Sequence, residues 1–289
     1  LFTALVRQGY EPDQVRLATL AAHIRQAKAA GQVALIFGLQ NTECLGRDLS
    51  RLETLYGLGV RIVQLTYNER NWVGDGYLER TDAGLSDFGV SAVRRLNALR
   101  MLVDLSHCGP TTTLDAASVS QAPVAATHTG AQAVYPHPRN KSDDELRAIA
   151  ATGGVIGILA YPLFLRREGD DSLEDVLDHL DHVVRLVGVE HVGIGHDNFR
   201  HGSLQDFQAQ ARAGIATGME RVSRRMPPGQ MFSPERWANR HALRVRGFEG
   251  ITAWPNLTRG LVRRGYSDDD IRLILGGNWL RLWAQIWGG

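Results

Sequence analysis

The stretch RMLVDLSH at residues 100–107 is the pattern on which the fold prediction depends. It is a short apolar run that ends on polar side chains, and five further runs share this form: VALIFGLQ (33–40), VRIVQLTY (60–67), PVAATHT (123–129), GVIGILAY (154–161) and HVGIGHD (191–197). Short runs rich in Val, Ile and Leu are typical of buried strands. Amphipathic segments with helix-capping residues separate them. This alternation predicts an α/β fold in which helices cover a parallel sheet.

Two architectures contain such a sheet, an open doubly wound sheet and a closed (β/α)8 TIM-type barrel. The sequence has no GxGxxG or Walker loop, which disfavours a nucleotide-binding sheet. A barrel needs two more strands, and since residues 13–31 have a helical pattern, we expect the missing strands upstream of Leu1. We predict one domain over residues 1–289, with six strands between 33 and 197. A helical segment is expected over 198–289, ending in two packed helices.

Composition excludes several classes of protein. The 289 residues include 32 basic and 31 acidic side chains spread along the chain, so a dedicated nucleic-acid surface is not expected. Cys44 and Cys108 are the only cysteines, which rules out a disulfide framework and fits a reduced, cytoplasmic location. No apolar run approaches the length of a membrane span, so no membrane association is expected. These features give no indication of a nucleic-acid or membrane partner.

Polar side chains stand at the carboxyl end of every predicted strand, and in a parallel barrel these ends meet at one face. His107 and His128 end two neighbouring strands, and Asp197 follows the last one. Two histidines and a carboxylate are typical of a hydrolytic zinc, manganese or iron site. The alternative is that each histidine only caps its strand against solvent. The combination of all three residues favours the metal site.

Two further charged residues have open interpretations. Asp104 either orients a metal ligand or stabilises the turn at Ser106. Arg139 either binds a substrate carboxylate through its planar fork or forms a salt bridge with Asp143 or Asp144.

The chain resembles the membrane (renal) dipeptidase family of amidohydrolase-like metal-dependent barrels. The resemblance lies in GLQN, LGVRIVQLTYN, GLSDFG, VDLSH, RNKSDDELR, GIGHD and the closing NLTRGLVRRGYSDDDIRLILGGNWLR. It implies a (β/α)8 barrel, a binuclear and usually zinc-containing site, dipeptide hydrolysis and a possible homodimer. By position, His107 and His128 match the histidines of the second metal. Arg139 matches the arginine that binds the substrate carboxylate, and Asp197 matches the aspartate that transfers a proton.

The sequence departs from the family pattern at three places. Gln40 replaces the glutamate that bridges the two metals, and a neutral amide is a weak ligand. Tyr67 replaces a substrate-binding histidine, and we place Tyr67 and Asn68 at the substrate. The His-x-Asp pair of the family's first strand has no counterpart here. Glu43, the nearest carboxylate to Gln40, differs in position, and His196 is expected to point away from Asp197. We therefore predict one zinc ion rather than two, with manganese or iron as substitutes.

The predicted function is a metal-dependent hydrolase of the dipeptidase type, acting on a dipeptide or a related small amide with a free carboxylate. Two alternatives stay open. The same barrel with altered chemistry would open a lactam or lactone, or act as a lyase or isomerase on a specialised metabolite. A homologue that had lost its metal would bind a ligand without turnover.

Overall fold

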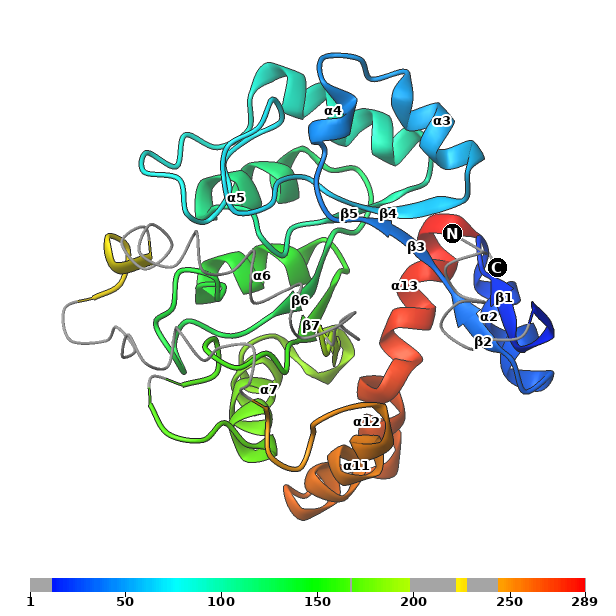
Figure 1. Ribbon diagram of the computed structural model, residues 1–289, viewed down its shortest axis with the longest axis vertical. Coiled ribbons are helices and arrows are strands. Elements are labelled where there is room, and N and C mark those ends of the chain that lie inside the picture. Colours follow the sequence, from blue (N-terminus) through cyan, green and yellow to red (C-terminus); the bar gives the residue numbers. More distant parts are fainter. Residues whose placement is uncertain (1–11, 167, 198–221, 228–243, 289) are drawn as a thin grey trace, which may run out of the picture.

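A six-stranded parallel sheet forms the centre of the computed structural model, which describes residues 12–166, 168–197, 222–227 and 244–288 (Figure 1). The strands pair in chain order: β3 (Phe37–Leu39), β4 (Val60–Gln64), β5 (Leu102–Asp104), β6 (Ala125–Thr129), β7 (Val155–Ile158) and β8 (Val192–Ile194). Every pairing is parallel. Each of the six predicted runs thus contains a strand of this sheet, and the predicted parallel α/β fold of the barrel type is confirmed.

The prediction was wrong in detail before Phe37. The run 33–40 is divided between β2 (Val33–Leu35) and β3, and β2 pairs with a short strand, β1 (Val15–Leu17), in a separate two-stranded sheet. The stretch predicted as helical therefore holds β1 as well as the helix α2 (Ala21–Ala29). Three residues of β1 are too few for a sequence pattern to reveal. Within the described residues no strand pairs with both β3 and β8.

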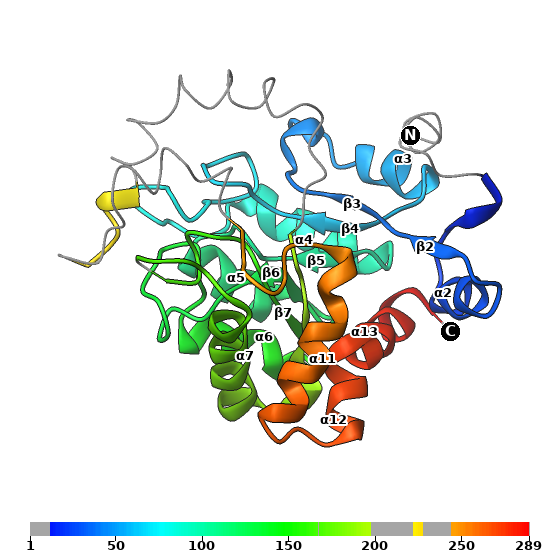
Figure 2. The ribbon, with the colours of Figure 1, turned by 60° about the horizontal axis from the view of Figure 1, so that its bottom comes forward.

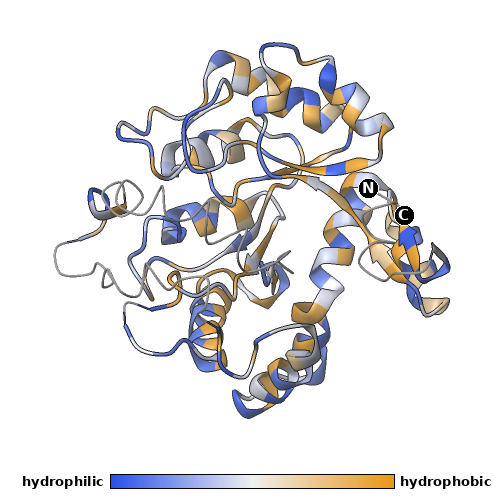
Figure 3. Cartoon of the chain, viewed as in Figure 1, coloured by the Kyte–Doolittle hydropathy of each residue, from blue (hydrophilic) through white to orange (hydrophobic). Residues whose placement is uncertain are grey.

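Helices follow the strands β3 to β7 and cover the sheet, as predicted. They are α3 (Arg51–Gly57), α4 (Asp87–Ala98), α5 (Pro110–Val119), α6 (Asp143–Ala151) and α7 (Leu173–Val187). Figure 3 shows apolar residues on the strands and on the helix faces turned toward them. Local sequence sets the helix starts: Ser142 and Glu145 form a capping box at α6, each side chain accepting from the other's backbone N–H. The core lies between the sheet and these helices.

The C-terminal part of the chain packs beside α7 and beneath the sheet (Figure 2). It contains α11 (Trp254–Arg263), α12 (Asp268–Arg272) and α13 (Asn278–Trp287), with a π-helical turn (Leu273–Gly277) between the last two. The second of the two predicted helices is therefore an interrupted one. The rest of the predicted helical segment, 198–221 and 228–243, lies outside the described residues. None of the described helices combines the length and apolar character needed to cross a bilayer.

Glycine at position 157 is required by the close approach of β7 to β6. A Cβ atom there would lie 2.0 Å from the carbonyl oxygen of Thr127, whereas a Cβ at Gly57, at the end of α3, would meet nothing within 4 Å. We expect Gly157→Ala to destabilise the protein by about 1–3 kcal/mol or more, because backbone must move to accept the methyl group. Gly57→Ala, the matched control, should be neutral or stabilising by up to about 1 kcal/mol. Thermal unfolding of both variants measures this, and equal melting temperatures would contradict it.

A buried histidine makes stability depend on pH. His179 of α7 is fully buried, its Nδ1 accepts from Ala131 N at 2.9 Å and its Nε2 donates to Leu165 O at 3.1 Å. Burial lowers the pKa of His179 to about 4. The unfolded chain takes up this proton near pH 6.5, so the contribution of neutral His179 is complete above that pH and is lost as pH falls toward 4.

We therefore expect the free energy of unfolding to decrease from pH 6.5 to 4. His179→Gln should lower stability at pH 7 but make this decrease shallower. Urea unfolding at several pH values measures both slopes. Some slope should remain in the variant, since burial also lowers the pKa of His137, to about 3. Identical slopes in the two proteins would show that His179 does not titrate in this way.

Candidate metal-binding and substrate-binding site

Two imidazole rings meet at the carboxyl ends of β5 and β6. The Nε2 atoms of His107 and His128 are 3.1 Å apart, and both side chains are buried. The Nδ1 atom of His107 lies 2.8 Å from Asn68 Oδ1, and that of His128 lies 2.8 Å from Thr127 Oγ1. The amide oxygen of Asn68 can only accept, so His107 carries its proton on Nδ1. Its Nε2 lone pair therefore points at His128.

The surroundings keep both rings neutral. Burial lowers the pKa of His107 well below its ordinary value, and the charge of Arg139 acts in the same direction. Burial and Arg139 also lower the pKa of His128, against a smaller opposing effect of Asp104 and Asp197. Neutral imidazole is the form that binds metals.

The spacing of the two nitrogens fits a shared metal ion. Two nitrogens bound at about 2.0–2.1 Å in tetrahedral geometry lie roughly 3.3 Å apart, close to the observed separation. The amide of Gln40 joins the pair, with its Nε2 atom 3.2 Å from His128 Nε2. Rotation of this amide would turn its oxygen toward the same point. The described residues contain no group of three or more His, Cys, Asp and Glu side chains placed to hold a metal, so the donor set is two histidines and a weak amide.

Two other potential ligands lie elsewhere. Glu43 is exposed on the turn Glu43–Leu45 and takes no part in the site. His196 points away, as strand alternation predicts: its Nε2 donates to Phe248 O at 3.0 Å, and its ring contacts Phe248 and Trp254.

Arg139 is buried beside the two histidines. Its Nη1 donates to Ser106 O at 2.5 Å, its Nη2 donates to His128 O at 2.8 Å, and its Nε has no partner among the described residues. Burial lowers the pKa of Arg139, and the nearby Tyr77 and Asp197 partly offset this. The alternative salt bridges are not formed, since Asp143 pairs with His182 and Arg147, and Asp144 with Arg147.

The remaining predicted residues surround the rings. Tyr67 stacks on His107 with ring centroids 4.2 Å apart, and 38% of its surface is exposed. Burial and the charge of Asp197 raise the pKa of its hydroxyl. Asn68 is engaged with His107, as described above. Asp197 follows β8 with φ of 56°, a left-handed conformation that non-glycine residues adopt mainly where the surroundings enforce it.

Sequence reasoning missed Thr127 as part of the site. In a regular strand, its side chain would point to the face opposite His128. The pairing of β6 with β7 has a register shift between Ala126 and Thr129, and such bulges redirect side chains. A short apolar run gives no signal of a bulge.

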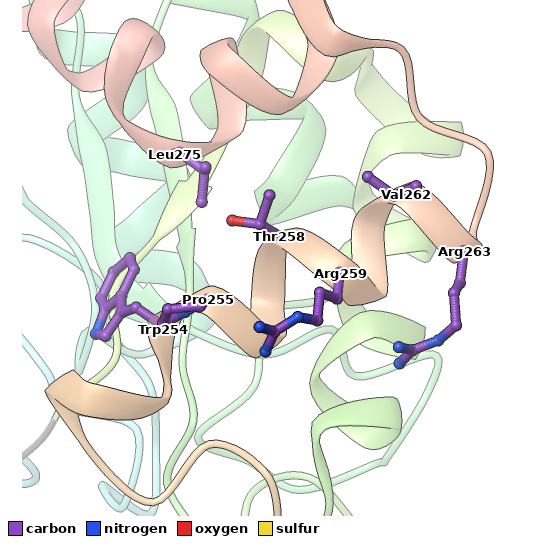
Figure 4. A pocket seen from close by; sticks show the side chains of 7 residues that line it. All are labelled: Trp254, Pro255, Thr258, Arg259, Val262, Arg263 and Leu275. Carbon is purple, nitrogen blue, oxygen red and sulfur yellow. The ribbon is translucent and has the colours of Figure 1, made fainter.

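A surface hollow on α11 is a separate feature (Figure 4). It is lined by Trp254, Pro255, Thr258, Arg259, Val262, Arg263 and Leu275. This lining includes no imidazole, thiol or carboxylate, so it offers no metal ligand and does not compete with the site at the strand ends.

A family model and a related protein that match this chain both carry the name dipeptidase. The membrane dipeptidase model of peptidase family M19 matches residues 3–208 and 241–287. An uncharacterized dipeptidase from Schizosaccharomyces pombe is 36% identical over 262 residues, covering 88% of this chain and 53% of that protein. The chain thus spans about half the length of this relative.

Solved structures agree with the fold. An amidohydrolase from Pseudomonas aeruginosa is 31% identical with a TM-score of 0.83, and the match covers 100% of this chain and 84% of that one. A metallopeptidase from Rhodobacter sphaeroides, liganded with a phosphinate mimic of the dipeptide L-Ala-D-Ala, is 26% identical with a TM-score of 0.77. That match covers 99% of this chain and 72% of the other.

Proposed function

The chain belongs to the membrane dipeptidase family, peptidase family M19, and we propose that it is a metal-dependent hydrolase of dipeptides or related small carboxylate-bearing amides. One observation carries the proposal. Two neutral imidazoles converge 3.1 Å apart beside a buried guanidinium that has no carboxylate partner among the described residues. The first feature suits a cation, and the second suits an anion. A metal ion would supply the cation, and a small substrate with a carboxylate near its scissile amide would supply the anion.

His107 and His128 would hold the metal, with the Gln40 amide as a weak third ligand. We favour one zinc ion, with manganese or iron as substitutes, because Gln40 supplies no negative charge to hold two dications close together. A bound ion of this kind polarises a carbonyl oxygen and lowers the pKa of a water molecule.

Arg139 would bind the substrate carboxylate. Burying a guanidinium without a counter-ion is costly, and backbone carbonyls offset this only in part, so an incoming carboxylate gains a strong, desolvated ion pair. Because Nη2 of Arg139 is bonded to the carbonyl of His128, the carboxylate site adjoins the metal ligands. This proximity restricts the substrate to a short molecule.

Asp197 and Tyr67 would complete the pocket. Asp197 is the carboxylate we assign to proton transfer toward the leaving amine, since its charge acts on both His128 and Tyr67. The ring of Tyr67 stacks on that of His107, and its exposed edge would contact the substrate. Tyr67 is neutral where the family has a basic histidine, so this side of the pocket suits a neutral part of the substrate such as a cyclic amide. Lactams therefore belong in the substrate screen.

The metal assignment predicts a specific loss. Purified protein should contain close to one equivalent of zinc, manganese or iron by elemental analysis. His107→Ala should lose most of this metal and reduce dipeptide hydrolysis by about 10²-fold or more, since one of two nitrogen ligands is gone. His182→Ala, a histidine paired with Asp143 outside the site, is the control and should retain both. Full activity of metal-free His107→Ala would refute the proposed function.

The assignment of Arg139 predicts a substrate-dependent effect. Arg139→Met should reduce kcat/KM for a dipeptide by about 10²-fold, mainly through KM, because a desolvated charge pair is lost. The same change should reduce hydrolysis of the matching dipeptide amide by a clearly smaller factor, since that substrate loses only the support that Arg139 gives to the carbonyls of Ser106 and His128. Arg147→Met, at an exposed arginine, is the matched control. Equal losses on the two substrates would place the carboxylate elsewhere.

A further inference from the structure

A buried carboxylate connects the ends of β5 and β6. Asp104 is 3% exposed, and four donors surround it. Its Oδ1 accepts from Ser106 N at 3.0 Å, Ser106 Oγ at 2.5 Å and Thr127 N at 2.9 Å, while its Oδ2 accepts from Thr127 Oγ1 at 2.6 Å. An ionised carboxylate can satisfy all four, because it has acceptor sites only.

The hydroxyl protons follow from this arrangement. Thr127 has one hydroxyl proton, and it is given to Asp104. Toward His128, at 2.8 Å, the same oxygen can therefore only accept, so the proton of this contact is on Nδ1 of His128. The Nε2 atom of that ring is left as an unprotonated lone pair facing His107.

We propose that Asp104 is a positioning residue that acts through Thr127 to hold His128 in its Nδ1–H tautomer. This rests on the proposed function only for its purpose, which is to present Nε2 to the metal. Ser106 extends the same effect, because its Oγ accepts from His128 N at 3.0 Å and its carbonyl accepts from Arg139. The carboxylate of Asp104 thereby positions the imidazole of His128 and the backbone carbonyl of Ser106, which accepts from Arg139.

A purely structural role makes a different prediction. Asp104 also joins two neighbouring strands, which pair in register only at Asp104 and Ala125. If its function were only to tie these strands, any isosteric group that keeps the tie would serve. The tautomer proposal instead requires a group that accepts from Thr127 Oγ1.

Asp104→Asn separates the two roles. The asparagine oxygen can take the three donors now on Oδ1, which leaves its NH2 group facing Thr127 Oγ1. That hydroxyl then accepts from the amide and can donate to His128 Nδ1, 2.8 Å away, or to Ser106 Oγ, 3.1 Å away. The imidazole nitrogen is the nearer and the stronger acceptor, so we expect the hydroxyl to donate to it and the imidazole proton to move to Nε2. Long-range 1H–15N NMR of the metal-free protein with labelled histidine reads the tautomer directly. We expect Nδ1–H in the parent chain and Nε2–H in Asp104→Asn, with zinc affinity reduced by about 10–100-fold.

Two further variants keep the test decisive if Asp104→Asn fails to fold. Thr127→Val removes the acceptor of His128 Nδ1 and should give a mixture of tautomers. Thr129→Val, two residues along the same strand and also buried, should keep the parent tautomer. An unchanged Nδ1–H signal in Asp104→Asn, or in Thr127→Val, would overturn the proposal. A tautomer change without any zinc binding to the parent chain would support the positioning role and count against the proposed function.

Discussion

Two opposite charges are buried at the carboxyl end of the sheet, and the geometry of the site depends on how each is compensated. Asp104 and Arg139 do not form an ion pair with one another. Both contact the backbone of Ser106, whose N–H donates to the carboxylate and whose carbonyl accepts from the guanidinium. This orientation satisfies part of each charge without neutralising either. Burial without full neutralisation is costly, and it is a feature of sites that bind a further charged group.

A second buried positive charge, on Lys141, holds the segment that carries Arg139. Lys141 is 2% exposed and donates to Cys108 O, Thr113 Oγ1 and Glu145 Oε1 at 2.7–2.9 Å. Its bond to Cys108 fixes the turn that directly follows His107. Asn140 donates to Tyr135 O and Phe164 O, so the segment after β6 is tied on both sides of Arg139. Rigid support of this kind keeps a binding group in place before the substrate arrives.

Much of the fold and part of the site were predictable from the sequence. Strands such as Leu102–Asp104 are apolar throughout, and their order along the chain implies a parallel sheet with polar ends at one face. That reasoning selected His107 and His128 as candidates, while Arg139 was a candidate from its sequence motif and the family resemblance, and the structure brings the three together. It could not find β1, which is too short to have a pattern, or Thr127, whose direction depends on a bulge. Nor could it choose between the two interpretations of Asp104, because that choice depends on which protons are donated across two strands.

Charge balance gives a reason to favour one metal ion. With formal charges of −1 for each of Asp104 and Asp197 and +1 for Arg139, the pocket carries a net formal charge of −1 before a metal binds. One dication brings this to +1, and a substrate carboxylate brings it to neutrality if the amino group of the substrate is uncharged. Two dications would leave +2 with the substrate bound, in surroundings where charges are poorly screened. A carboxylate at position 40 would reduce that excess, and Gln40 does not. Under the function we propose, the replacement of one acidic side chain therefore bears on metal number, and the two histidines and Arg139 would be the residues of a single-ion hydrolase.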